Sequence, residues 1–467
     1  MSNQRPATLG ALRESGYVVL PVREEMRRNL IAKLEGGEDI FPSIVGYEET
    51  VIPQLENAIL GGQDIILLGE RGQAKSRITR MLTTLLDEWT PIIRGAEIPE
   101  NPFAPISAQG REIVEKDGDD TEVRWLHRDE RYGEKLATPD ITIADLIGEV
   151  DPIKVAEGRY LSDELTIHYG LIPRTNRGIF AINELPDLAE RIQVGLLNAM
   201  EARDIQIKGH KVRLPLDVFI VATANPEDYT NRGRIITPLK DRYGAQIRTH
   251  YPTTIRDEMR IMSLEHADLD MGDRKVIVPA YMKEIIAELT RHARKSPDIS
   301  QRSGVSVRAS ISNYESLLAN ALRRALRCGE HDVVPRVSDL PFVLPSLQGK
   351  VEFETVEEGR EDQVVERLLQ ASVSAAFNRF VDLSELEPVV SAFAEGISVE
   401  TGEGLDSDSY AAMIKDIDGL DAAVSRLAES QSPAERASAA EFILEGMHLN
   451  KLLNKDRVSG HTRYRAR

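Results

Sequence analysis

The sequence predicts an α/β fold in which a parallel sheet carries helices on both faces, followed by an all-α lid and a further helical region. Three apolar runs indicate the sheet, at residues 65–68, 178–182 and 218–224. Strands that are buried on both faces are continuously apolar rather than alternating. Helical patterns separate these runs, and that order is typical of parallel strands joined by helices.

The first apolar run leads into a loop that fits phosphate binding. Such loops follow the pattern G-x-x-x-x-G-K-[ST]: backbone N–H groups surround the phosphates, the lysine reaches their oxygens, and the hydroxyl group binds Mg²⁺. Ala74 stands where the pattern has its second glycine. We therefore expect the nucleotide to be bound by the whole loop, which consists of Gly69, Glu70, Arg71, Gly72, Gln73, Ala74, Lys75 and Ser76.

Polar residues follow the second and third apolar runs. Asn183 and Glu184 come at the end of the second run, and Asn225 comes at the end of the third. Nucleotide hydrolases place a metal-associated carboxylate and a water-orienting residue at such strand ends. The segment Leu239-Lys-Asp-Arg242-Tyr then follows. These elements in this order predict a nucleotide hydrolase.

The chain resembles the AAA+ ATPases, and among them the ATPase subunit of magnesium chelatase and the MoxR-like proteins. The likeness spans about residues 38–345. Besides the segments described above, Phe41-Pro-Ser-Ile-Val-Gly-Tyr47 near its start carries the resemblance. It implies that Lys75 and Ser76 bind ATP and Mg²⁺. It further implies a homohexameric ring, because Arg242 would reach the nucleotide of a neighbouring subunit.

The resemblance also assigns catalytic roles. Glu184 would be the catalytic carboxylate, and Asn225 the sensor that orients water near the γ-phosphate. Arg308 would contact the γ-phosphate from the lid. Asn183 would support Mg²⁺ together with Ser76, although the family usually has an aspartate at this position. We expect Asn183→Asp to raise hydrolysis by adding the missing charge.

Glycine breaks and changes in hydrophobic pattern and charge divide the chain into four regions. We expect an N-terminal extension (1–37), a nucleotide-binding α/β domain (38–256), a helical lid (257–345) and an acidic helical extension with a basic tail (346–467). Two inserts distinguish the α/β domain, one at about 146–173 and a hairpin at 201–214 with alternating apolar residues beside a glycine turn. Residues 94–122, rich in Pro, Gly and charge, are expected to form a loop.

Composition excludes several classes of protein. The single cysteine, Cys328, rules out an internal disulfide and a cysteine metal cluster. No apolar stretch approaches the roughly 20 residues of a membrane span, so we expect a cytoplasmic protein without membrane contact. Residues 345–448 contain 22 acidic against 7 basic residues. Such a surface repels phosphates, so we expect no direct binding of nucleic acid.

The last residues of the chain are basic. We expect them to form a disordered solubilising end, with contact to an acidic partner as the alternative. The cations of this tail are Lys451, Lys455, Arg457, Arg463, Arg465 and Arg467.

Three functions are compatible with this sequence. The first is a motor of the chelatase or MoxR type that remodels a partner or assists metal insertion, the partner carrying a metal-dependent integrin-like domain. The second is an ATPase that remodels the transcription machinery. The third is an ATP-sensing scaffold with little hydrolysis, which Ala74 and Asn183 favour. The hairpin at 201–214 would be the element that pushes on a partner.

Overall fold

The computed structural model divides into two compact units, residues 1–250 and 251–467. It describes residues 5–151, 153, 156, 164–201, 204–206, 213–225, 234–267, 269, 272–301, 304–354, 360–458 and 461–467. None of the helices within these ranges is long and apolar enough to cross a membrane.

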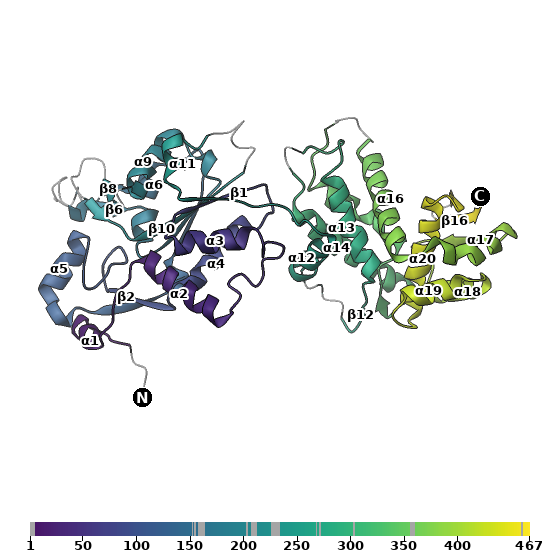
Figure 1. The fold of residues 1–467 in the computed structure, drawn as a ribbon, viewed down its shortest axis with the longest axis horizontal. Coiled ribbons are helices and arrows are strands. Elements are labelled where there is room, and N and C mark those ends of the chain that lie inside the picture. Colours follow the sequence, from purple (N-terminus) through teal and green to yellow (C-terminus); the bar gives the residue numbers. More distant parts are fainter. Residues whose placement is uncertain are drawn as a thin grey trace. The chain divides into compact units, whose positions relative to one another are not determined.

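The first unit is built on a parallel five-stranded sheet (Figure 1). Neighbouring strands pair in parallel throughout, with Ile65 opposite Val221 and Phe219 opposite Ile179. The predicted fold class is therefore confirmed. The strand order is β11 (Ala245–Arg248), β1 (Ile65–Leu68), β10 (Val218–Ala224), β7 (Gly178–Asn183) and β4 (Tyr132–Leu136).

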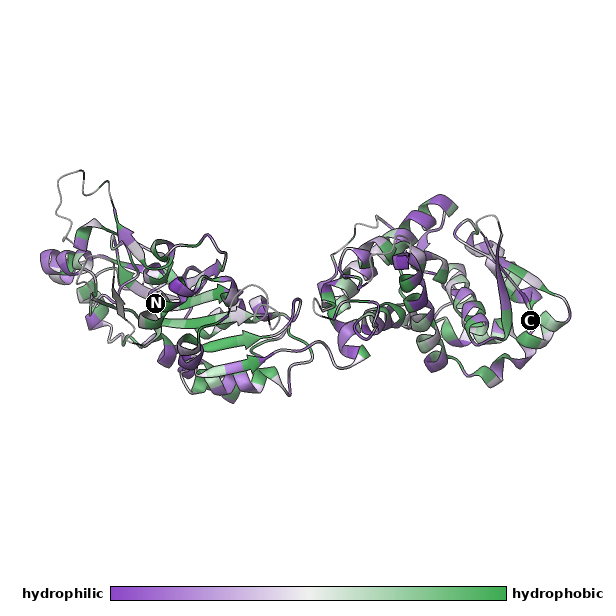
Figure 2. Cartoon of the chain, turned by 90° about the horizontal axis from the view of Figure 1, so that it is seen from above, coloured by the Kyte–Doolittle hydropathy of each residue, from purple (hydrophilic) through white to green (hydrophobic). Residues whose placement is uncertain are grey.

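Each face of this sheet is buried under helices. Because side chains alternate across a strand, Ile65 and Leu67 enter one core while Ile66 enters the other. The three central strands are accordingly apolar along most of their length (Figure 2). One core contains residues of α2 (Val22–Gly36), α3 (Val51–Leu60) and α4 (Lys75–Met81), and the other contains residues of α6 (Ile143–Leu146), α8 (Leu171–Arg174), α9 (Glu190–Glu201) and α11 (Thr237–Arg242).

The N-terminal helix α2 is bound to the sheet by buried polar contacts. Both oxygens of the Glu25 carboxylate accept hydrogen bonds from the Arg131 guanidinium, at 2.7 and 2.6 Å. The backbone N–H of Val22 donates to the Asp217 carboxylate at 3.0 Å. Buried charges are stable only when they are paired in this way, so α2 is an integral part of the first unit.

Short antiparallel pairs flank the sheet. Both expected inserts contain one, namely β5 (Gly148–Val150) with β6 (Ile167–Tyr169), and β8 (Asp204–Gln206) with β9 (Arg213–Pro215). The tip of the expected hairpin, residues 207–212, lies outside the described residues.

The prediction of a loop at 94–122 is wrong in part. Helix α5 (Ala108–Asp117) forms there, because the Ser107 hydroxyl caps its start by accepting the Gly110 N–H at 2.9 Å. The segment joins β2 (Trp89–Ile93) to β3 (Val123–His127), and α1 (Leu9–Glu14) precedes α2.

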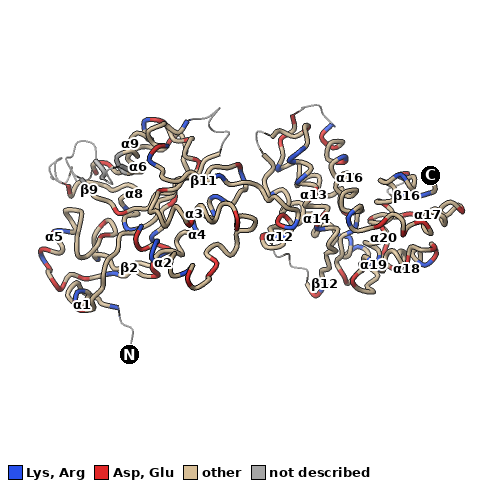
Figure 3. The backbone as a smooth tube through the Cα atoms, in the orientation of Figure 1, with Lys and Arg blue, Asp and Glu red and all other residues tan. Residues whose placement is uncertain are grey.

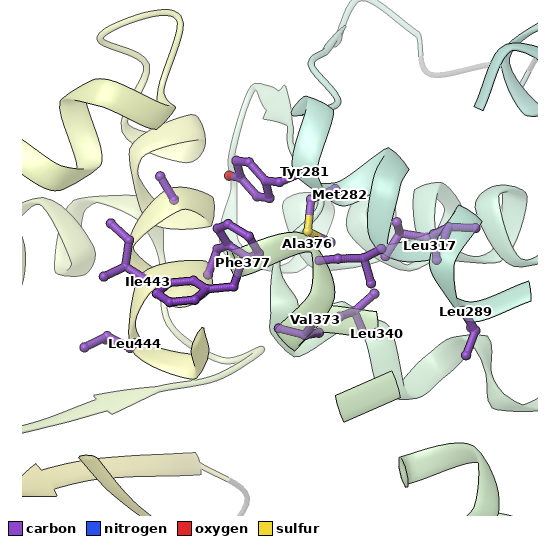
Figure 4. Packing of buried hydrophobic residues seen from close by; sticks show 14 of the residues in the cluster. Tyr281, Met282, Leu289, Leu317, Leu340, Val373, Ala376, Phe377, Ile443 and Leu444 are labelled. Carbon is purple, nitrogen blue, oxygen red and sulfur yellow. The ribbon is translucent and has the colours of Figure 1, made fainter. Parts of the chain in front are cut away.

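The second unit is mainly helical, as predicted. Its core joins the region expected as the lid to the C-terminal extension, with Tyr281 stacked on Phe442 at 4.3 Å between ring centroids. Figure 4 shows Phe377 of α16 lying between residues of α13 and α20. The helices are α12 (Ile255–Glu265), α13 (Ala280–Ala293), α14 (Val307–Cys328), α15 (Leu344–Gln348), α16 (Arg360–Phe380), α17 (Glu387–Ala394), α18 (Ser407–Asp416), α19 (Leu420–Leu427) and α20 (Pro433–Leu449), and the short strands β12 (Lys275–Val276) and β13 (Asp332–Val333) pair in parallel.

The prediction of a disordered basic tail is wrong. The tail forms β15 (Leu453–Val458) and β16 (His461–Ala466), which pair with each other and with β14 (Ser398–Thr401). Acidic and basic positions both occur along this C-terminal part of the chain (Figure 3). Four of the tail's cations form ion pairs: Lys455 with Glu445 at 2.7 Å, Arg457 with Glu366 at 3.1 Å, Arg463 with Glu400 at 2.5 Å and Arg465 with Asp456 at 2.6 Å. Tyr464 of β16 is buried, and its hydroxyl donates a hydrogen bond to Glu445. The ion pairs and this buried side chain favour an ordered tail.

Candidate nucleotide site

The loop between β1 and α4 packs closely against side chains at its first glycine. A Cβ at Gly69 would lie 1.9 Å from the Thr249 hydroxyl oxygen and 2.2 Å from the Gln73 side-chain oxygen. Any other residue at position 69 would force these two side chains to move. The loop also borders a cavity of about 490 Å³, which is lined by Leu68, Gly69, Glu70, Gln73, Lys240, Gln246, Arg248 and Thr249.

Two loop residues have left-handed backbone conformations. Gly72 has φ 74°, and Ala74 has φ 56° and ψ 12°. Glycine enters this region without penalty, whereas a Cβ costs roughly 1–2 kcal/mol. The conformation explains why the pattern has glycine at position 74. Ala74 keeps the loop geometry at the cost of local strain.

Ala74→Gly is expected to stabilise the first unit by about 0.5–1 kcal/mol. Relief of the strained Cβ outweighs the greater conformational freedom that glycine brings to the unfolded chain. Thermal or urea unfolding followed by circular dichroism measures the change. The matched control is Ala32→Gly on the exposed face of α2, which should destabilise by about 1 kcal/mol. Equal losses from the two substitutions would contradict strain at position 74.

Lys75 is buried at the start of α4, with its ammonium group inside the loop. Its Nζ donates hydrogen bonds to the carbonyl oxygens of Gly69 and Glu70, the latter at 2.8 Å. It also donates to the side-chain oxygen of Asn225 at 2.8 Å. The structure thus brings the predicted lysine and the predicted sensor into direct contact, although they are 150 residues apart in sequence.

The loop is fastened to the chain that follows β11 and to the segment before α3. The Thr249 hydroxyl donates to the Gln73 side-chain oxygen at 2.7 Å. The Tyr47 hydroxyl contacts the backbone carbonyls of Gln73, at 3.1 Å, and His250, at 2.7 Å. Burial raises the pKa of Tyr47 to about 12, so this hydroxyl remains a donor at neutral pH.

Asn183 and Glu184 end β7 beside the tip of β10. The Thr223 hydroxyl donates to the Asn183 side-chain oxygen at 3.2 Å and lies 3.2 Å from the Glu184 backbone nitrogen. Glu184 has φ 55° and ψ 48°. Non-glycine residues held in this conformation concentrate at functional sites, which supports the role that the sequence predicts for Glu184.

Sequence reasoning missed Glu134 on the neighbouring strand β4. Its Oε1 accepts a hydrogen bond from the Asn183 Nδ2, and its Oε2 lies 2.9 Å from both the Nε and an Nη of Arg80. No motif surrounds Glu134 in the sequence. Its role becomes visible only in the sheet order, which places β4 beside β7.

The remaining predicted residues occupy different places. Arg71 and Ser76 are exposed on the loop and on the first turn of α4. Arg242 ends α11, where an Nη donates to the Pro238 carbonyl oxygen of the same helix at 3.1 Å. Arg308 is exposed in the first turn of α14, in the second unit. The roles of Arg242 across an interface and of Arg308 toward a phosphate stay predictions.

The donor atoms around α4 suit Mg²⁺. This ion prefers oxygen ligands and retains several waters. The Ser76 hydroxyl, the Asn183 amide oxygen and the Glu134 carboxylate are all oxygen donors. Asn183 and Glu134 lie on the paired strands β7 and β4, and Ser76 lies on α4, whose Thr79 and Arg80 contact β4. No group of three or more His, Cys, Asp or Glu in the described ranges could hold a metal by itself. A site that also uses phosphate oxygens therefore fits better than an all-protein metal site.

Curated proteins show what the chain is similar to. It is 26% identical over 323 residues to the magnesium-chelatase subunit ChlI of rice (Oryza sativa subsp. indica). The alignment covers 61% of this chain and 70% of that protein. A further match is the ChlI subunit of Nostoc, with 25% identity over 230 residues, covering 48% of this chain and 57% of that protein. These matches confirm the predicted resemblance to the AAA+ ATPases of the magnesium-chelatase type. No family model matches it.

Other matches to this AAA+ protein are more distant. YeaC of Bacillus subtilis, itself uncharacterised, is 24% identical over 264 residues, covering 52% of this chain and 76% of YeaC. Among solved structures, a chain from the complex of magnesium-chelatase subunits BchI and BchD matches with a TM-score of 0.36 and 18% identity, covering 72% of this chain and 94% of that chain. A structural similarity this low carries no inference about function.

Proposed function

We propose that this AAA+ protein binds Mg·ATP at residues 69–76 and hydrolyses it. The observation that carries the proposal is the position of Lys75. Its ammonium group lies among loop carbonyls and contacts Asn225, at the edge of the sheet where Asn183 and Glu184 also end their strand. Phosphate-transfer sites need this combination of a loop cation and polar strand ends.

Each residue then has a defined task. The Lys75 ammonium group and the loop N–H groups would neutralise phosphate charge, and Glu184 would polarise the attacking water. When ATP binds, its phosphates would replace Asn225 as the partner of Lys75. The Asn225 side chain would then be available to orient the attacking water. Mg²⁺, when bound beside Ser76 and Asn183, would offset negative charge on the phosphate oxygens. Arg242 would add a cation to a neighbouring subunit's site.

We further propose that hydrolysis drives a ring, most simply a hexamer, that remodels a partner protein. The relatives named as magnesium-chelatase subunits support this and suggest assistance with metal insertion. We propose, from the sequence resemblance alone, that the partner carries an integrin-like domain. The strands β8 and β9 pair antiparallel, and we propose that the sequence between them, residues 207–212, contacts the partner. We propose the cytoplasm as the place of action.

Phosphate release from Mg·ATP tests the proposal. The unmodified protein should hydrolyse ATP, whereas Glu184→Gln should bind ATP with unchanged affinity and hydrolyse it at least about 100-fold more slowly, because a positioned general base contributes 10²–10⁴-fold. Calorimetry measures the affinity. Glu122→Gln, which removes an exposed carboxylate paired with Arg94, is the control and should leave both quantities unchanged.

Two results would change the proposal. ATP binding without measurable hydrolysis in the unmodified protein would favour the ATP-sensing scaffold, in which binding alone alters the assembly. Equal hydrolysis by the unmodified protein and Glu184→Gln would show that Glu184 is not the catalytic carboxylate.

A further inference from the structure

Asn183 occupies the position where a carboxylate is expected, and the structure has a carboxylate beside it. Glu134 lies on β4, which pairs in parallel with β7, and Leu136 is directly opposite Asn183 in the register. The two side chains are hydrogen-bonded. Glu134 and Asn183 therefore form a hydrogen-bonded pair between neighbouring strands, although 49 residues separate them in sequence.

The chemistry of this contact requires an amide at position 183. An ionised carboxylate accepts hydrogen bonds and donates none, so the group that faces Glu134 must be a donor. The Asn183 amide meets this need with its nitrogen, while its oxygen accepts from Thr223. An aspartate at 183 would place two carboxylates in contact, which like-charge repulsion disfavours.

Glu134 also lies on the side of α4 that carries Ser76. Ser76 and Arg80 are four residues apart on α4, so they lie on one face of this helix. Arg80 binds Glu134 at 2.9 Å, and the preceding residue Thr79 contacts the Tyr132 hydroxyl of β4 at 3.0 Å. The face of α4 that begins with Ser76 is thus turned toward β4.

The ion pair with Arg80 leaves acceptor positions on the Glu134 carboxylate for other partners. The Arg80 side chain is 65% exposed and that of Glu134 is 22% exposed, and exposed pairs of this kind contribute little stability. A carboxylate offers about four acceptor positions, so Glu134 can serve Asn183, Arg80 and a metal-bound water together.

We propose that Glu134 and Asn183 have exchanged roles, so that Glu134 supplies the negative charge of the Mg²⁺ site and Asn183 is the amide that positions it. The inference rests on the proposed binding of Mg·ATP. It assigns to β4 the charged residue that completes the site, and it reverses the expectation that Asn183→Asp would raise hydrolysis.

The test measures the ATP affinity by calorimetry twice, with Mg²⁺ and with EDTA, in the full-length protein. The ratio of the two affinities is the gain due to Mg²⁺. Glu134→Gln should lower this ratio about tenfold, while the affinity in EDTA stays within about twofold. Asn183→Asp alone should lower the rate of hydrolysis. The double variant Glu134→Gln with Asn183→Asp should recover the ratio to within about threefold, because it restores one carboxylate and one amide.

Two controls separate this role from a structural one. Arg80→Ala should keep or raise the ratio, whereas Glu122→Gln should leave it unchanged. If Glu134 only anchored Arg80, Arg80→Ala would reproduce the loss seen in Glu134→Gln, and that result would overturn the proposal. An unchanged ratio in Glu134→Gln, or faster hydrolysis in Asn183→Asp, would overturn it as well.

The outcome for the unmodified protein distinguishes the two proposals. If it shows neither Mg²⁺-dependent affinity nor hydrolysis, the proposed function itself fails. If the unmodified protein shows both, but the double variant does not recover the ratio of ATP affinities with Mg²⁺ and with EDTA, only the role of Glu134 fails. Circular dichroism of each variant confirms that the compared proteins are folded.

Discussion

Lys75→Ala is expected to abolish ATP binding at the nucleotide loop. Lys75 is buried, and its ammonium group is the cation that faces the loop interior. Removing one partner of a buried, hydrogen-bonded charge pair costs about 2–5 kcal/mol. With about 1.4 kcal/mol per tenfold change, the affinity should fall at least about 30-fold and approach the limit of detection.

Calorimetry with Mg·ATP measures this loss. Lys116→Ala on the exposed side of α5 is the control, since it removes the same charge from the same unit without touching the loop. ATP affinity equal to that of the unmodified protein would refute the assignment of residues 69–76. Thermal unfolding should accompany the measurement, because the carbonyls of Gly69 and Glu70 lose their donor when Lys75 is removed.

Arg242→Ala should leave ATP binding intact and slow hydrolysis about 10³-fold or more. An arginine that stabilises transferring phosphate contributes 10³–10⁵-fold. In this structure the Arg242 side chain is 28% exposed and contacts the Pro238 carbonyl and Asp241 of its own helix, so reaching another subunit would require it to leave these contacts. Arg124→Ala, which removes an exposed arginine paired with Glu130, should have no effect.

Mixing two inactive variants tests whether Arg242 acts across an interface. Arg242→Ala subunits retain Glu184, and Glu184→Ala subunits retain Arg242, so mixed rings contain interfaces with both residues intact. Activity should therefore reappear on mixing. If mass measurement proves that mixed rings form and activity stays absent at every ratio, Arg242 does not act in trans.

The positions of the strands and of the nucleotide loop could be predicted from the sequence because they depend on local patterns. Residues 65–68, 178–182 and 218–224 are continuously apolar, and each forms a buried strand. The loop pattern specifies backbone conformations that its own residues impose, as the left-handed Gly72 shows. Position 74, where the pattern has glycine and this chain has alanine, also adopts a left-handed conformation, with φ 56°.

The short, half-exposed strand β4 gave no comparable signal. Its residues do not form a buried apolar run, so the sequence indicated neither the strand nor the contact between Glu134 and Asn183. Cross-strand contacts depend on which strands become neighbours, and that choice involves the whole sheet. The basic tail was mispredicted for the same reason, since its charges are balanced by distant residues such as Glu366 and Glu400.

The sequence by itself thus determined the α/β fold class and the set of residues around the phosphates, because periodicity, loop pattern and strand ends are properties of neighbouring residues. Only the tertiary structure decided where the missing carboxylate of the metal site comes from and how the basic tail is ordered. Both depend on contacts between segments far apart in the chain, where packing and charge pairing outweigh local preference.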